Sequence, residues 1–147
     1  MHYTDLESCS LFSKIARVPV LAVGWLQPGH IHTEGGVDPT IVDRLCELLA
    51  NPWQPGLALG VHQCEFCRLT GGPTIFARGH FRIELGVNNL FVPTSEVVYV
   101  APSTILHYMD AHEYAPPTEF CDAVMACPPM RSMSYLRLIA QSGLSRR

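Results

Sequence analysis

Two short stretches of the sequence gather residues that bind metals. HQCEFC, residues 62–67, holds two cysteines in C-x-x-C spacing, and HYMDAH, residues 107–112, holds two histidines in H-x4-H spacing. A tight turn at C-x-x-C can point both thiolates at one ion, and the histidine spacing falls within the range of structural zinc sites. Four protein ligands fill a tetrahedral ion and leave no position for water or substrate, so the predicted zinc is structural. The predicted ligands are Cys64, Cys67, His107 and His112.

The histidine spacing requires a departure from a regular helix. Residues five apart in an α-helix differ by about 140° around its axis. His107 and His112 can therefore share an ion only if the helix unwinds near Ala111. The EYAPP that follows ends the helix and makes this unwinding plausible. Asp110 could orient one imidazole by hydrogen bonding.

Other interpretations of the cysteines and histidines stay open. His62 competes for one ligand position through its H-x-C spacing, and Cys121 is a weaker competitor. A redox C-x-x-C needs a helix directly after the motif, and Gly71-Gly72-Pro73 leaves little room for one. A metal-free domain with reduced, inert cysteines is a further alternative.

The enzyme alternative is an open zinc site. HTE at residues 32–34, together with CEFC, resembles the H-x-E…P-C-x-x-C signature of zinc nucleoside deaminases. The resemblance implies His32 as a third ligand and Glu34 as a proton carrier. Gln63 stands where that family has proline, and glycine-containing breaks follow both motifs where the family has helices. We therefore lean away from an enzyme.

Hydrophobic periodicity predicts the elements that position these residues. Apolar and alternating runs indicate strands, and apolar residues at helical spacing after capping residues indicate helices. The order of strand, C-x-x-C knuckle, hairpin and ligand-bearing helix is typical of treble-clef-like zinc modules. We predict a single small α+β domain over residues 1–147, with a mixed or antiparallel sheet and C-terminal helices. Expected strands are 18–26, 57–62, a hairpin within 74–85, 90–93 and 96–100; expected helices are 38–50, 102–112, 118–126 and 133–141.

Composition narrows the functional classes. The chain has 147 residues, 48% of them hydrophobic and 16% charged, which is typical of one globular domain. Its formal net charge is −3 and Lys14 is the sole lysine, so no nucleic-acid partner is expected. No apolar run approaches the roughly 20 residues that span a bilayer. The N-terminal stretch lacks the order of a signal peptide, so we expect a cytoplasmic protein with no membrane partner.

A longer segment carries a family resemblance. APSTILHYMDAHEYAPPTEFCDAV, preceded by HQCEFC and the FRIEL strand, resembles a group of small bacterial proteins. They share an H-x-C-x-x-C segment and an AP-x-x-I-x-HY-x-x-x-H-x-Y-x-PP-x-x-F segment. The resemblance covers about residues 57–126 and implies a compact bacterial cytosolic domain with no assigned activity.

The combined hypothesis is a zinc-stabilised module that binds another protein. One candidate surface is the strand face formed by His80, Arg82 and Glu84, and another is the 27–36 loop with nearby Trp53. A homodimer through the terminal helix is a second arrangement, although that helix is better suited to capping the core. Its apolar residues are Tyr135, Leu136 and Ile139.

Overall fold

Two small sheets and four helices make up the regular structure of the described residues. The computed structural model describes residues 2–10, 12, 14–55, 62–67 and 69–144; the strand expected at 57–62 lies mostly outside them. In chain order the elements are β1 (Val20–Ala22), α1 (Pro39–Leu49), β2 (Ile75–Arg78), β3 (Phe81–Glu84), β4 (Asn89–Pro93), β5 (Val98–Pro102), α2 (Ile105–Ala111), α3 (Thr118–Ala126) and α4 (Met133–Ser142).

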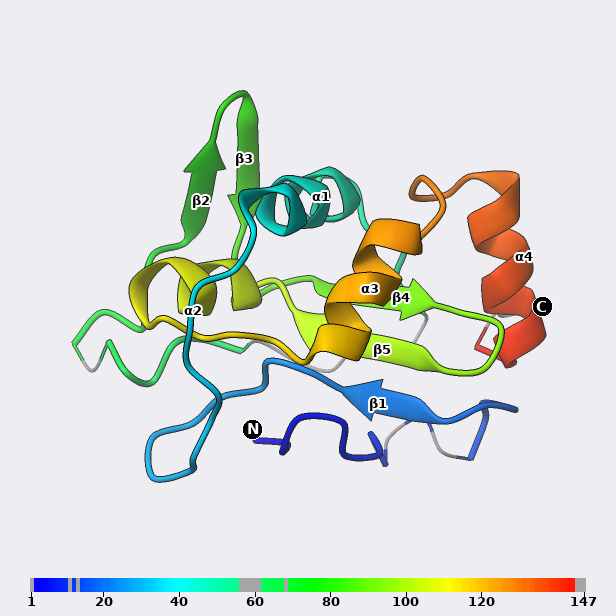
Figure 1. Cartoon of the computed structure of the whole chain (residues 1–147), viewed down its shortest axis with the longest axis horizontal. Helices are drawn as coiled ribbons and strands as arrows, with labels where there is room; N and C mark the ends of the chain where they lie inside the picture. The colour runs from blue at the N-terminus through cyan, green and yellow to red at the C-terminus, as the bar shows by residue number, and fades with distance from the viewer. Residues whose placement is uncertain (1, 11, 13, 56–61, 68, 145–147) are drawn as a thin grey trace.

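The larger sheet is mixed. Its strand order is β1-β5-β4, with β1 parallel to β5 and β4 antiparallel to β5. The smaller sheet is the antiparallel hairpin β2–β3, which stands beside α1 (Figure 1). The predicted α+β domain with a mixed sheet and C-terminal helices is therefore confirmed, with a second hairpin, β4–β5, before the ligand-bearing helix α2.

Helix α1 begins and packs as its sequence predicts. The Asp38 carboxylate accepts a hydrogen bond from the Thr40 backbone N–H at 2.9 Å, and Pro39 occupies the first turn, where its missing N–H has no cost. The apolar stripe that includes Leu45 and Leu48 is fully buried. This stripe fixes α1 against the sheet and α3.

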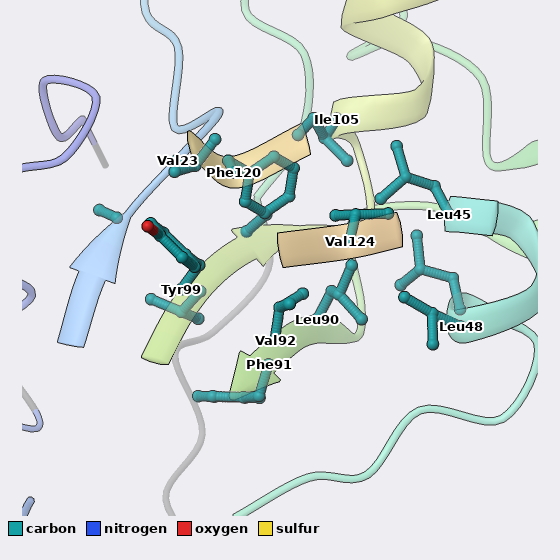
Figure 2. Packing of buried hydrophobic residues seen from close by; sticks show 14 of the residues in the cluster. Val23, Leu45, Leu48, Leu90, Phe91, Val92, Tyr99, Ile105, Phe120 and Val124 are labelled. Atoms are coloured by element: carbon teal, nitrogen blue, oxygen red, sulfur yellow. The ribbon is translucent and has the colours of Figure 1, made fainter. Parts of the chain in front are cut away.

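The core lies between the larger sheet and helices α1 and α3. Figure 2 shows Leu45 and Leu48 of α1 gathered with Val124 of α3 and Leu90 of β4; all four side chains are fully buried. Burying one such aliphatic side chain contributes about 1.5–3 kcal/mol. The core thus depends on several elements that are far apart in sequence.

Helix α4 caps one end of this core. Tyr135 and Ile139 are buried, and the Tyr135 hydroxyl donates a 2.6 Å hydrogen bond to the Phe91 carbonyl. Leu136 is 38% exposed. The expected role in capping the core fits this packing, and two of the three residues considered for a dimer interface face inward.

The N-terminal segment covers the outer edge of β1. Leu6 and Cys9 donate backbone hydrogen bonds to the carbonyls of Ala22 and Val20, each at 2.7 Å, and Ala22 donates one to Glu7 at 2.8 Å. Figure 1 shows this segment running beside β1, on the side away from β5. The edge of the larger sheet is therefore paired along β1.

Three predicted boundaries are wrong. The first strand spans three residues of the expected 18–26, because Gly24 takes a φ of +78° and its N–H turns to the Asp5 carboxylate. Pro102 ends β5, a position that proline tolerates, and α2 begins at Ile105. His80 lies in the β2–β3 turn, so the expected strand face retains only the exposed Arg82 and Glu84.

No described helix is both long enough and apolar enough to cross a membrane.

Candidate metal centre

The four predicted ligand residues converge from two segments of the chain. The Cys64 Sγ lies 3.4 Å from the His112 Nε2, and the Cys67 Sγ lies 3.5 Å from the His107 Nε2 and 3.7 Å from the His112 Nε2. The two Nε2 atoms are 3.3 Å apart. All four candidate ligand atoms lie within 4.8 Å of one another. The arrangement could hold one metal ion.

These separations match a tetrahedral site. Zinc–sulfur bonds of about 2.3 Å and zinc–nitrogen bonds of about 2.05 Å, at tetrahedral angles, place nitrogen and sulfur about 3.6 Å apart and two nitrogens about 3.3 Å apart. The observed nitrogen–sulfur distances of 3.4, 3.5 and 3.7 Å and the nitrogen–nitrogen distance of 3.3 Å are close to these values. The other two separations are within 4.8 Å, so the group could close around an ion of zinc's size.

The C-x-x-C turn directs backbone donors at the first sulfur. The backbone N–H groups of Phe66 and Cys67 both donate to the Cys64 Sγ, which favours the thiolate. Burial acts in the opposite sense and raises the pKa of the Cys64 thiol, and the neighbouring Cys67 adds to this. Two thiolates at these positions would need a nearby cation, and a metal ion held by the group could supply it.

Two glycines let the loop close over the turn. The Cys64 N–H donates to the Gly71 carbonyl at 2.9 Å, and the Gly71 N–H donates to the Cys67 carbonyl at 2.8 Å. Gly72 has a φ of +86°, and a Cβ there would lie 2.9 Å from the Cys64 Cβ and 3.5 Å from the His107 Nε2. The loop can approach both ligands this closely only because residue 72 has no side chain.

The histidine segment unwinds where the spacing requires it. His107 lies within α2 and is buried, whereas His112 is the first residue after the helix, with φ −122° and ψ 15°. Glu113 then adopts a left-handed conformation, φ +54°. The backbone leaves the helical conformation at His112 itself, and the His112 Nε2 lies 3.3 Å from the His107 Nε2. Within the described chain, Asp110 makes no hydrogen bond to either imidazole, so its predicted orienting role has no support.

His62 has a different partner from the one considered in the sequence. Its Nε2 lies 2.7 Å from the Tyr108 hydroxyl, and its ring packs edge-on against Trp25 at 5.1 Å. Burial, with a smaller contribution from His2, lowers the pKa of His62 to about 4. A neutral His62 thus holds Tyr108 by a hydrogen bond, and Tyr108 is the residue that follows His107 in α2.

The remaining candidates lie outside the cluster. The Cys121 Sγ contacts the Pro116 carbonyl at 3.9 Å. The His32 ring packs on Phe66 and Tyr114, and Glu34 pairs with Tyr114 in an isolated β-bridge. Among the described residues the metal-binding group contains neither His32 nor a carboxylate. His32 and Glu34 therefore do not join the two cysteines as in the deaminase signature, and the group of four is completed by His107 and His112.

Fold and site together define a small α+β domain with a Cys2His2 group that could bind a metal ion. The chain belongs to a family described as a domain of unknown function, DUF7919, whose model matches residues 1–125. No curated protein and no solved structure matches the chain. All four candidate ligands lie within the matched range, whereas α4 lies beyond it.

Proposed function

We propose that the protein is a zinc-stabilised binding module whose metal is structural. The observation that carries this proposal is the match between the four sulfur and nitrogen positions and a tetrahedral ion. Four protein ligands leave no coordination position for water or a substrate. The metal then serves the fold.

Zinc is the ion that this donor set favours. Tetrahedral sites of two thiolates and two imidazoles suit zinc, whereas magnesium and calcium prefer oxygen ligands. The two thiolate charges balance the two positive charges of the ion. Burial also lowers the pKa of His107, with the neighbouring His112 adding to the effect, so this ring is held in the neutral form that binds metal.

The zinc would add a strong link between two segments that already meet through the hydrogen bonds of His62 to Tyr108 and Thr104. Cys64 and Cys67 sit in an irregular loop, and His107 and His112 sit on and just after α2. A single ion between them would fix the loop at residues 62–72 against α2. This is the task of a structural site in a small domain.

A binding role fits the rest of the molecule better than catalysis does. The closed ligand set offers no site for chemistry, and the net charge of −3 does not suit nucleic acid. Two aliphatic side chains, Ile31 and Leu69, are fully exposed at loop positions. The partner we propose is another protein. The similarity to small bacterial proteins supports a bacterial, cytoplasmic setting.

Metal content and thermal stability test the zinc site. Elemental analysis of tag-free protein should give about one zinc per chain, and the melting temperature should fall when a chelator removes it because the ion binds the folded state. Cys64→Ser and His107→Ala should each lose zinc and lower the melting temperature. Cys121→Ser is the matched control, since it removes a half-buried thiol outside the cluster. A metal-free protein with an unchanged melt on chelation would contradict the proposal.

A further inference from the structure

A cleft lies on the face of α2 away from the metal centre. It has a volume of about 560 Å³ and is formed by α1, α2, β2 and the 34–37 loop. Volumes of this size are typical of ligand sites. Helix α2 is therefore shared, with His107 directed to the metal cluster and Met109 and Asp110 lining the cleft.

The polar lining of the cleft has an excess of negative charge. Three exposed carboxylates border it, those of Glu34, Asp110 and Glu113. None of them forms an ion pair with another described residue. The one cation that lines the cleft, Arg78, is already bound to Asp43 of α1 at 2.6 Å. A positively charged group entering the cleft would meet unpaired carboxylates.

The apolar lining and a strand edge indicate the rest of the ligand. Phe76 of β2 and Met109 of α2 are only partly buried and present apolar surface to the cleft. β2 pairs with β3 alone among the described strands, so its other edge has backbone N–H and C=O groups that a further strand could pair with. Extended peptides bind proteins by adding a strand at such an edge.

We propose that this cleft binds an extended peptide segment in which lysine or arginine side chains alternate with apolar ones. The basic side chains pair with Glu34, Asp110 and Glu113, and the apolar ones rest on Phe76 and Met109. The inference rests on the proposed zinc site to the extent that α2 and Glu113 are positioned by their metal-binding neighbours. Beyond the proposed binding role, it specifies the partner as a basic and partly apolar extended peptide.

A labelled peptide provides the test. Fluorescence anisotropy is measured for fluorescein-labelled Val-Arg-Val-Arg-Val with the full, zinc-loaded chain, and for two control peptides, Val-Glu-Val-Glu-Val and Ser-Arg-Ser-Arg-Ser. Saturable binding of the first peptide is expected, with both controls weaker. Each exposed carboxylate should contribute about two- to fivefold to affinity. The triple variant Glu34→Gln, Asp110→Asn, Glu113→Gln should therefore bind roughly tenfold or more weakly.

A matched triple variant controls for net charge. Glu96→Gln, Glu119→Gln and Asp122→Asn remove the same number of exposed carboxylates outside the cleft and should leave affinity unchanged. Absence of saturable binding, equal loss in both triple variants, or equally tight binding of butylammonium ion alone would overturn the inference.

Zinc content separates this inference from the proposed function. A zinc-loaded protein that fails to bind the peptide would overturn the cleft assignment and leave the metal site standing. A folded, zinc-free protein that binds the peptide with the expected variant pattern would support the cleft and overturn the zinc proposal.

Discussion

Cys64 and His107 are almost fully buried, with exposed fractions of 1% and 6%, although both side chains are polar. In the described chain their side-chain hydrogen-bonding capacity is directed at other members of the cluster. The sulfur and nitrogen atoms of the four residues approach each other at 3.3–3.7 Å, and there is no clear hydrogen-bond donor for each acceptor. One shared cation would compensate the burial of all four atoms better than hydrogen bonds among them. The burial and close approach of these side chains therefore favour a bound metal over a hydrogen-bonded network.

Gly72 allows a direct test of the close approach around Cys64. Gly72→Ala should reduce zinc occupancy and lower the free energy of unfolding, because its Cβ would lie 2.9 Å from the Cys64 Cβ. Gly29→Ala is a matched control, since Gly29 has a nearly equal φ, +89°, and a Cβ there would meet no other atom within 4 Å. Both variants carry the left-handed backbone cost of about 1–2 kcal/mol. The measurement is urea unfolding with zinc analysis; equal losses in both variants would contradict a steric role for Gly72.

Residue types and spacing were sufficient to select the four residues that meet. A C-x-x-C turn and two nearby histidines are local patterns with a known geometric consequence. The partner of His62 was not predictable in the same way, because Tyr108 is 46 residues away and nothing local distinguishes its hydroxyl. Asp110 was overvalued for the opposite reason: it is close in sequence to both histidines but lines the cleft instead.

At the scale of elements, the end of α2 determines the metal geometry. The N–H groups of His112 and Tyr114 both donate to the Tyr108 carbonyl, at 3.0 and 3.1 Å, while Glu113 between them has a φ of +54°. This is a left-handed helix ending formed without glycine. It redirects the chain directly after His112 and ties Tyr114 back to α2, so the backbone on both sides of the second ligand is held by the Tyr108 carbonyl.

Substitutions at Glu113 should reveal how much the site depends on that ending. Glu113→Asn should keep zinc and stability, because asparagine tolerates a left-handed conformation. Glu113→Val should destabilise the protein by about 1–2 kcal/mol and weaken zinc retention, since a β-branched residue resists positive φ. Both variants remove the same carboxylate. The comparison uses urea unfolding and zinc release to a competing chelator; equal behaviour of the two variants would contradict a conformational role for residue 113.

Helices with clear caps were predicted more accurately than strands. α1 begins at Pro39 after its Asp38 cap, and α3 has the predicted bounds although no side chain caps its start, because capping residues, prolines and apolar periodicity are local signals. The start of α2 was misplaced because Pro102, which the sequence suggested as the first turn of a helix, is the last residue of β5 and pairs with Asn89. β1 was overestimated because a continuous apolar run does not reveal where a glycine leaves the sheet.

At the scale of the whole molecule, the metal cluster lies beside the main core. The packing in Figure 2 joins α1, α3, β4 and β5 with Ile105 of α2, and the buried hydrophobic cluster also includes Cys64. The parallel pairing of β1 with β5 connects distant parts of the chain. That pairing could not be predicted from local patterns, because it depends on how the intervening helix and hairpins pack.

Removal of zinc should therefore unfold the molecule unevenly. Amides in α2 and in residues 62–67 and 69–72 should lose hydrogen-exchange protection first, while those of β4 and β5 keep theirs longer, since the latter are held by the core. Mass-spectrometric exchange before and after chelation measures this order, and Cys64→Ser without chelator should reproduce it. Simultaneous loss across all elements would show that the ion supports the entire fold.

The N-terminal segment along β1 has a consequence for solubility. A bare sheet edge is a template on which strands of other molecules can add, and this route leads to aggregation. Residues 6–9 occupy that template on β1 through backbone hydrogen bonds to Val20 and Ala22. Removing this short stretch would leave most of the hydrophobic core in place. It would also expose the backbone N–H and C=O groups along β1, on which strands of other molecules could then add.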